Sequence, residues 1–505
     1  MSPIRDWRTP ATVAASVIAA KGLAFVREAV VASELGISAS SDAYYLAFAL
    51  PTVLYNLLAL PFSLWVTARL TVPAPGRGES GATLYRRALL LVSGLGTVLT
   101  LGVVATAAML VATYAPGLEG NRLAEAVSVT RIGALAIPAL GIQAVTNGKL
   151  FGQRRFTVAY GWLALSGLVG LAVVIELTRK YGAAGAVLGF VAAGWTAALG
   201  GLFAARRTVD GGRSAPEAGA LPEFGPGVVY RACVMQVFFQ GSLLLLYAFG
   251  SGLPPGELAA SLFGSKVQTA VYETVVVTAG VLVYPRIAHL LQTRDHMAVR
   301  RTMMQALNWL LPATAGLVVL LITCRGEIVS LIYQRKAFDD RAARLVASAL
   351  LGYAPGIVGL TLVEIFHRTM VLRGRLEGYL VVFSGALMLN WLCCHFLVPV
   401  FGVLGLTLSS SVGVLTAGTG LVTYASRRLE SMDTRQMVLL VIRTSAAGGV
   451  TLAALTALHA LVSMGPSALG QIITVAGSGV MGVTILTLAL LALGHRWQVP
   501  ARVKG

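Results

Sequence analysis

The sequence predicts an all-α polytopic membrane protein with 14 transmembrane helices, organised as two six-helix lobes related by a parallel repeat plus two C-terminal helices. Three observations predict this fold: the composition, the recurrence of apolar stretches and the distribution of positive charge. Of the 505 residues, 56% are hydrophobic and only 12% are charged, and the mean hydropathy is +0.77. A soluble domain usually carries about 25% charged residues. A membrane is therefore the expected environment.

Apolar stretches of about 20 residues, the length that spans a bilayer, recur from residue 10 to residue 494. We predict fourteen spans, at residues 11–33, 42–68, 88–113, 126–148, 157–178, 183–205, 227–249, 258–284, 306–324, 346–367, 378–399, 402–425, 437–461 and 469–494. The first span has no small-residue cleavage site, so we expect it to be retained. Pro51 and Pro61 lie inside the second span and are expected to bend it.

Positive charge alternates between the segments that join these spans. With the N-terminus in the cytoplasm, the cytoplasmic segments hold 27 of the 39 Lys and Arg residues, and the outer segments hold nine. This bias predicts cytoplasmic N- and C-termini. Most of the net charge of +18 thus reflects topology, and we expect no nucleic-acid partner.

The chain contains an internal repeat at an offset of 220 residues. "KYGAAGAVLGFVAAG" at 180–194 aligns with "VFGVLGLTLSSSVGV" at 400–414, so that Gly182 matches Gly402 and Gly185 matches Gly405. An even number of spans separates the copies, which predicts a parallel repeat. The predicted domains are an N-lobe at 1–205, a cytoplasmic linker at 206–226, a C-lobe at 227–428, and two further spans with a cytoplasmic tail at 429–505.

Several functional classes find no support in the sequence. The four cysteines form no CxxC pair and lie in or near apolar runs, which indicates small core residues and neither a disulfide nor a metal site. No segment resembles a nucleotide-binding loop, so ATP is not the expected fuel. The sequence therefore predicts no bound cofactor; coupling to the membrane potential, to H⁺ or to Na⁺ is left open.

Four charged residues occupy positions where hydrocarbon is expected. Lys21 and Arg27 lie inside the first span, Asp42 begins the second, and Lys266 lies inside the eighth. Isolated cations in a membrane span are costly, so this excess of positive charge predicts an anionic ligand such as a phosphate. The alternative is a set of structural ion pairs, Arg27 with Glu28 or with Asp42. Lys21 and Arg27 are six residues apart, about 120° around a helix, and do not share one face.

Weaker polar signals lie in the second half of the chain. Glu273 and Glu364 are candidates for carrying a proton or a cation, or for pairing with neighbouring bases. Asn390 and Ser410 are candidate oxygen donors to a cation. Simple packing of these groups is an equally open interpretation.

These residues stand in segments that resemble the MurJ/MviN family, bacterial lipid II flippases of the MOP exporter superfamily. The similar segments are "GLAFVREAVVASELGISASSDAYYLAFALP" at 22–51, "GKLFGQRRFTVAYG" at 148–161, "LIYQRKAFDDRAARLVASALLGYAPGI" at 331–357 and "FGVLGLTLSSSVGV" at 401–414. The resemblance runs nearly end to end and includes fourteen spans.

The resemblance implies a transporter of the bacterial cytoplasmic (inner) membrane and not an enzyme. Its two six-helix lobes would alternate access to the two leaflets. Its implied substrate is an undecaprenyl-pyrophosphate-linked saccharide, lipid II above all, moved from the inner to the outer leaflet for peptidoglycan synthesis. Carried over to this sequence, the pyrophosphate-binding residues are Lys21, Arg27 and Lys266, with Asp42 as their acidic companion. The last two spans would form a groove for the lipid tail. Membrane lipids and cell-wall or polysaccharide synthesis proteins are the implied partners.

Departures from the family pattern keep other functions open. Lysine stands at 21 and 266, where the family usually has arginine, and Tyr55 and Asn56 stand where an arginine pair is expected. Asn390 is followed four residues later by Cys394, where some members have a carboxylate of a sodium site. The alternatives are a flippase for a lipid-linked exopolysaccharide or O-antigen unit, a MATE-like cation-coupled exporter, and a non-transporting scaffold of a cell-wall complex.

Overall fold

The computed structural model describes residues 8–59, 63, 81–153, 155–206, 226–279, 287, 290, 296–373, 376–428, 434–461 and 467–495. These residues divide into two compact units. Unit 1 comprises Met1–Phe224, Gly250–Ala259 and Arg335–Asp339, and unit 2 comprises Gly225–Phe249, Ala260–Gln334 and Asp340–Gly505. The predicted linker at 206–226 lies almost wholly outside the described residues.

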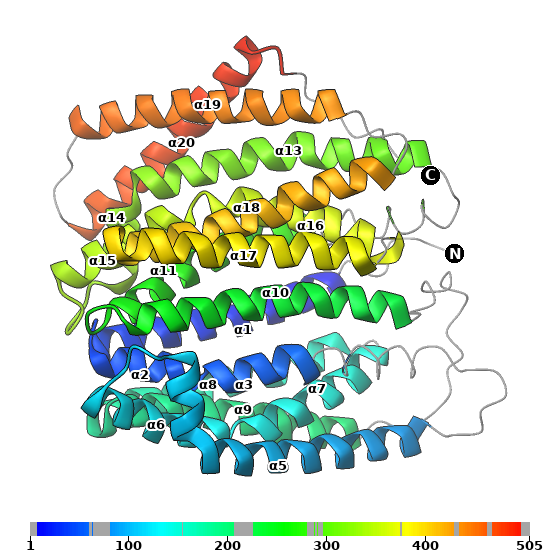
Figure 1. Cartoon of the computed structure of the whole chain (residues 1–505), viewed down its shortest axis with the longest axis vertical. Coiled ribbons are helices and arrows are strands. Elements are labelled where there is room, and N and C mark those ends of the chain that lie inside the picture. Colours follow the sequence, from blue (N-terminus) through cyan, green and yellow to red (C-terminus); the bar gives the residue numbers. More distant parts are fainter. Residues whose placement is uncertain are drawn as a thin grey trace. The chain divides into compact units, whose positions relative to one another are not determined.

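The part of the chain that the structure describes is built of helices and contains no strand, as Figure 1 shows. The helices that lie wholly in unit 1 are α1 (Arg8–Leu35), α2 (Ala39–Ala47), α3 (Ala49–Leu54), α5 (Gly81–Tyr114), α6 (Gly120–Ala134), α7 (Ile137–Gly152), α8 (Phe156–Tyr181) and α9 (Ala183–Arg206). Those that lie wholly or mainly in unit 2 are α10 (Pro226–Ser251), α11 (Glu257–Tyr272), α13 (His296–Thr323), α14 (Arg325–Tyr333), α15 (Asp340–Tyr353), α16 (Gly356–Arg373), α17 (Leu376–Phe401), α18 (Val403–Arg428), α19 (Thr434–Leu461) and α20 (Ala468–Ala492).

The predicted fold class, an all-α polytopic membrane protein, is confirmed. Among the described residues, ten helices are long and apolar enough to cross a membrane, or eleven if α15 and α16, which meet at a 45° bend, count as one span. The count of fourteen spans stays a prediction. Large apolar side chains also lie on helix surfaces: Met109, Val381, Val400 and Val480 are at least 69% exposed. Such surfaces suit lipid and not water.

The predicted correspondence of the glycines in the two halves is confirmed by local geometry. Gly182 joins α8 to α9 with φ +57°, and Gly402 joins α17 to α18 with φ +53°. A Cβ on Gly185 would lie 2.1 Å from the Leu177 carbonyl oxygen, and one on Gly405 would lie 2.2 Å from that of Leu397. Both helix pairs therefore need glycine at the turn and again three residues later.

The second span is interrupted, as its prolines predict. α2 ends at Ala47 and α3 begins at Ala49. If the helix continued without a break, the Pro51 ring would clash with the carbonyl of Ala47, four residues earlier. A short π-helix, η1 (Tyr55–Ala59), follows α3. A second π-helix, η2 (Glu273–Val277), follows α11. Pro61 lies outside the described residues.

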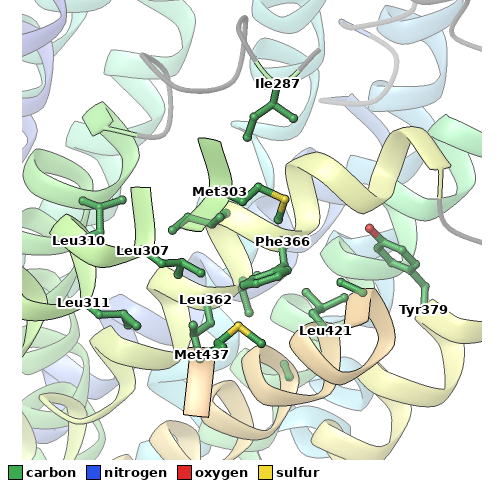
Figure 2. Close-up of a cluster of buried hydrophobic side chains, with 14 of the residues drawn as sticks. Ile287, Met303, Leu307, Leu310, Leu311, Leu362, Phe366, Tyr379, Leu421 and Met437 are labelled. Atoms are coloured by element: carbon green, nitrogen blue, oxygen red, sulfur yellow. The ribbon is translucent and has the colours of Figure 1, made fainter. Parts of the chain in front are cut away.

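The core of unit 2 is a large apolar cluster, drawn in Figure 2. Met303 and Leu307 of α13, Phe366 of α16 and Leu421 of α18 are fully buried in it, and Met437 of α19 is 3% exposed. Burying side chains of this size contributes roughly 1.5–3 kcal/mol each. The cluster thus holds α13, α16, α18 and α19 together, and its contact with α19 attaches one of the last two predicted spans to unit 2.

Two short segments are assigned to unit 1 although the chain on either side of each belongs to unit 2. They are residues 250–259, from the end of α10 to the start of α11, and residues 335–339, between α14 and α15. We name them the 250–259 segment and the 335–339 segment. The attachment of the first to unit 1 involves Asp42, one of the charged residues singled out by the sequence.

Candidate functional site

Arg27 lies in the second half of α1 and is mostly buried within unit 1. Its side chain is 15% exposed, and its Nη2 donates to Oε1 of Glu28 at 3.2 Å. Its guanidinium carbon lies 5.9 Å from the ring centre of Phe190 on α9, a cation–π distance. The expected alternative in which Arg27 pairs with Glu28 is therefore seen in the structure.

Glu28 collects three donors. Besides Arg27, Tyr44 donates to Oε1 at 3.4 Å and Tyr45 donates to Oε2 at 3.0 Å, both from α2. Both tyrosines are buried, and Tyr44 packs edge-on against Phe48 at 4.5 Å between ring centres. A buried carboxylate needs such donors to offset its desolvation. The result is a cation held in a fixed orientation inside an aromatic-walled site.

The Arg27 side chain still has unused hydrogen-bonding capacity. Its Nε atom is buried and has no hydrogen-bond acceptor among the described residues. A buried donor without an acceptor costs about 1–3 kcal/mol. An anion that reached this edge of the guanidinium would remove that cost, and the five-donor fork of arginine suits phosphate oxygens.

Lys21 is on the same helix but in a different environment. Its side chain is exposed, whereas Arg27 is mostly buried. This difference agrees with the expectation that the two residues, six positions apart, do not share one face of the helix. The structure thus places both on α1 without bringing them to one contact point.

Asp42 is engaged by the 250–259 segment. It lies in the first turn of α2, is 1% exposed, and accepts from the backbone N–H of Gly256 at 2.7 Å and of Ala259 at 2.8 Å. These amides lie at the start of α11, so Asp42 caps that helix from another element. Arg122 of α6 approaches the same carboxylate at 3.5 Å. The alternative pairing of Arg27 with Asp42 has no such contact in the structure.

Close backbone packing also holds the 250–259 segment. Gly117 donates its N–H to the Ser251 hydroxyl at 3.0 Å, and the Arg122 guanidinium lies 3.5 Å from the Leu253 carbonyl oxygen. Gly256 has φ +89°, and a Cβ there would lie 2.5 Å from the Ile37 backbone. Only glycine fits this position. The attachment is therefore specific in both shape and charge.

The 335–339 segment is attached at the end of α1. Glu34 accepts hydrogen bonds from Lys336 and, at 3.3 Å, from Arg179, and Ala337 donates its N–H to the Ser33 carbonyl at 3.1 Å. The hydrogen bond from Lys336 and the nearby positive charge of Arg179 lower the pKa of Glu34 from its ordinary value. Lys336 has φ +51°, which is uncommon outside glycine. Glu34 thus joins α8 and the 335–339 segment to α1.

In unit 2, Lys266 lies on α11 and is half-buried. Within this unit it has no ion-pair partner among the described residues. Six residues further along, Tyr272 donates to the Glu364 carboxylate of α16 at 3.3 Å. Glu273, the first residue of η2, is half-buried, and its backbone carbonyl accepts from Thr278 at 3.3 Å. Glu364 is therefore tied to the end of α11, next to the π-helix.

Asn390 and Ser410 each form a hydrogen bond within their own helix. Asn390 is 1% exposed, its Oδ1 accepts from the Cys394 thiol at 3.6 Å, and its Nδ2 has no acceptor among the described residues. Ser410 donates to the Leu406 carbonyl at 3.3 Å. A Cβ on Gly413 of α18 would lie 2.8 Å from the Cβ of Asn390. No group of three metal-ligating side chains gathers in the described parts of the chain.

Sequence reasoning missed most of the residues that surround the candidates. Tyr44, Tyr45 and Phe190 complete the Arg27 environment, and Arg122 completes that of Asp42. The tyrosine pair follows Asp42 after one intervening residue, Ala43. The contact of Arg122 with Asp42 follows only from the fold.

Comparison with known proteins gives the family. The sequence profile described as "Lipid II flippase MurJ" matches residues 31–477. A protein of Synechocystis sp. described as "Probable lipid II flippase MurJ" is 25% identical over 443 residues, which cover 83% of this chain and 81% of that protein. Proteins of Burkholderia cenocepacia, described as "Lipid II flippase MurJ", show 23% identity over 432 residues, 81% of each chain.

A solved structure described as "Lipid II flippase MurJ, inward closed conformation" has a similar fold, with a TM-score of 0.73 and 15% identity over 94% of this chain and 97% of that one. A multidrug resistance MATE family transporter of the MOP superfamily, solved in an inward-facing conformation, has a TM-score of 0.64 and 14% identity over 81% of this chain and 95% of that one. With the profile match covering far more than half of its length, this chain belongs to the MurJ family of lipid II flippases.

Proposed function

We propose that this chain is a transporter that moves lipid II from the inner to the outer leaflet of the bacterial cytoplasmic membrane by alternating access. The proposal rests on its membership of the MurJ family and on the cations within its apolar helices. In this role the chain catalyses no covalent step. Its substrate contributes a pyrophosphate, which supplies the anion that the predicted cation cluster requires.

The observation that carries the proposal is the state of Arg27. Its guanidinium is buried, oriented by Glu28 and Phe190, and left with an Nε–H that lacks an acceptor in the described structure. A pyrophosphate oxygen at this edge would form a charge-assisted hydrogen bond. In this proposal Lys21 and Lys266 provide further positive charge, and Asp42 limits their mutual repulsion.

The proposed lobes are residues 1–205 and 227–428, which alternate between states open to either leaflet. Asp42 binds the 250–259 segment, and Glu34 binds the 335–339 segment. Both segments belong to the C-lobe in sequence. We propose that these attachments close the outer side and that their release opens it. Substrate binding would then favour release only if the substrate binds the open state more tightly.

Cells depleted of their own lipid II flippase provide the test. Outer-leaflet lipid II is measured by cleavage with an added pyrophosphatase that does not cross the membrane, and the membrane abundance of each variant is checked. Arg27→Ala should lower the exposed lipid II at least tenfold, because a charge-assisted hydrogen bond is worth about 1.5–3 kcal/mol. Arg131→Ala on the exposed side of α6 is the matched control.

Removing Arg27 alone leaves the Glu28 carboxylate buried, which can destabilise the protein. Arg27→Ala combined with Glu28→Gln removes the pair together and keeps the test informative if the single variant is not inserted. Full transport by an inserted double variant would refute the pyrophosphate role of Arg27.

A second candidate substrate is another lipid-linked saccharide, such as an exopolysaccharide or O-antigen unit. Tyr55 and Asn56 favour it, because they stand at the start of η1 in place of two cations. Two results together would support this alternative. The wild-type chain would fail to restore outer-leaflet lipid II, and it would export a different lipid-linked saccharide in the same assay format.

We also propose that transport is coupled to the membrane potential, to H⁺ or to Na⁺. The residues proposed to bind the coupling ion are Glu273, Glu364, Asn390 and Ser410. Glu364 is the leading residue, since Tyr272 already orients its carboxylate. Glu364→Gln should abolish the dependence of transport on a proton gradient if Glu364 carries the proton. A gradient dependence unchanged from wild type would exclude it.

A further inference from the structure

A cavity of about 400 Å³ lies in unit 2, beside the apolar core of Figure 2. Its walls come from α13, α19 and the residues that follow α20: Met304, Asn308, Gln436, Leu439, Leu440, Arg443, Gly494 and His495. This volume lies within the usual range of small-molecule sites, about 300–1,000 Å³. None of the functional candidates above contributes to it, so it is a separate site.

The cavity combines one permanent positive charge with neutral polar groups. Arg443 supplies the charge, and its Nη1 donates to the Gly494 carbonyl at 3.1 Å, which fixes the guanidinium at the end of α20. Asn308, Gln436 and His495 supply neutral donors and acceptors. Among the residues that the structure describes, no acidic side chain lines the cavity. Its electrostatic preference is therefore for an anion.

His495 does not add a second charge at neutral pH. It is 4% exposed, and its backbone N–H donates to the Leu490 carbonyl at 2.9 Å. Burial and the adjacent positive charge of Arg443 lower the pKa of His495 below its ordinary value. The neutral imidazole can thus donate or accept a hydrogen bond without repelling Arg443.

The apolar part of the wall indicates what else the ligand must contain. Met304, Leu439 and Leu440 line the cavity together with Arg443, and Leu439 is 40% exposed. Leu439 and Val438 lie on a face of α19 where apolar side chains are exposed. The predicted topology places the start of α19 and the end of α20 at the cytoplasmic side of the membrane. An anion that fits here would be attached to an apolar body.

We propose that this cavity binds the phosphate headgroup of an anionic phospholipid from the cytoplasmic leaflet. Arg443 contacts the phosphate oxygens through the guanidinium donors that Gly494 does not use, and Asn308 and Gln436 hydrogen-bond the remaining headgroup oxygens. Met304, Leu439 and Leu440 contact the first acyl carbons. The bound lipid joins α13, α19 and the end of α20, and it is not the transported molecule.

Lipid binding to the full-length protein in detergent tests the proposal. Dioleoyl phosphatidylglycerol is titrated, and native mass spectrometry measures the concentration at half occupancy of the first bound lipid. Arg443→Gln should raise this concentration about tenfold or more, as expected for loss of a charge-assisted contact. Phosphatidylcholine, whose choline cation offsets its phosphate charge, should bind the wild type more weakly than phosphatidylglycerol and should lose less affinity in Arg443→Gln. Arg427→Gln, an exposed arginine at the end of α18, is the matched control.

A second variant distinguishes lipid binding in the cavity from an effect of Arg443 on the end of α20. Gln436→Trp fills the space while leaving the Arg443–Gly494 hydrogen bond intact, and it should weaken phosphatidylglycerol binding by a similar factor. Phosphatidylglycerol binding by Gln436→Trp equal to that of the wild type would overturn the proposal. So would displacement of the lipid by inorganic phosphate at equal concentration, because the site would then be one for free phosphate.

Discussion

Asp42→Asn offers the most direct test of how the 250–259 segment is held. The aspartate accepts two backbone N–H groups, at 2.7 and 2.8 Å, and lies 3.5 Å from Arg122. Asparagine has one carbonyl oxygen, and its amide N–H₂ would face one of the two backbone donors. The replacement also removes the negative charge of Asp42, which interacts favourably with the positive N-terminal end of α11 and with Arg122.

The expected cost follows from these contacts. A hydrogen bond to a charged group contributes about 1.5–3 kcal/mol, and one neutral hydrogen bond remains in the variant. We expect a net loss of about 2–3 kcal/mol for attachment of the segment, which corresponds to roughly a 30- to 150-fold larger detached population. Arg122, 24% exposed, adds little to this figure, because solvent screens it.

Cysteine labelling measures the detached population. Leu253 is 8% exposed, so Leu253→Cys in a background without native cysteines should react slowly with an impermeant maleimide added from outside. Adding Asp42→Asn should speed the reaction by the factor above. Glu119→Gln, which removes an exposed carboxylate from the same unit, should not. Equal labelling rates with Asp42 and with asparagine at this position would refute the capping role.

Three further predictions follow from single residues. Glu34 has a lowered pKa because its ionised carboxylate is bound by Lys336 and Arg179. Its contribution to attachment of the 335–339 segment is therefore complete above its ordinary pKa of 4.5 and is lost as the pH falls through the lowered value. Amide hydrogen exchange at Ala337 should accelerate there, and Glu34→Gln should remove that pH dependence. Lys266→Glu should transport less lipid II than Lys266→Ala, while Lys266→Arg stays active; equal activity of the Glu and Lys forms would exclude Lys266 from the site. Gly405→Ala, whose Cβ would meet a carbonyl at 2.2 Å, should lower the melting temperature by several degrees, whereas Gly385→Ala in open space should not.

The repeat and the helical class were predictable because each depends on local sequence. Gly182 and Gly402 each sit where two apolar spans meet, and the fixed offset between them identified the shared turn before any coordinate was known. Pro51 predicted the interruption of the second span for an equally local reason: its ring excludes a continuous helix.

The partners of the charged residues were not predictable in the same way. Both Glu28 and Asp42 were candidates for Arg27, and the sequence could not choose between them. Asp42 instead accepts from amides 214 and 217 residues later in the chain, a pairing that depends on the tertiary fold. Backbone amides have no sequence signature, so no reading of residue types could have assigned them to Asp42.

The two π-helices carry information about descent. Tyr55 begins η1 and Glu273 begins η2, 218 residues apart and each within the second long helical stretch of its half. A π-helix accommodates one extra residue within a long helix. Because π-helices are rare, a common origin explains two of them more simply than two independent origins do. A common origin of the two π-helices requires that an extra residue was present in one ancestral half before that half was duplicated. Structures of distant homologues with a π-helix at both places would support a common origin, and a π-helix in one half only would count against it.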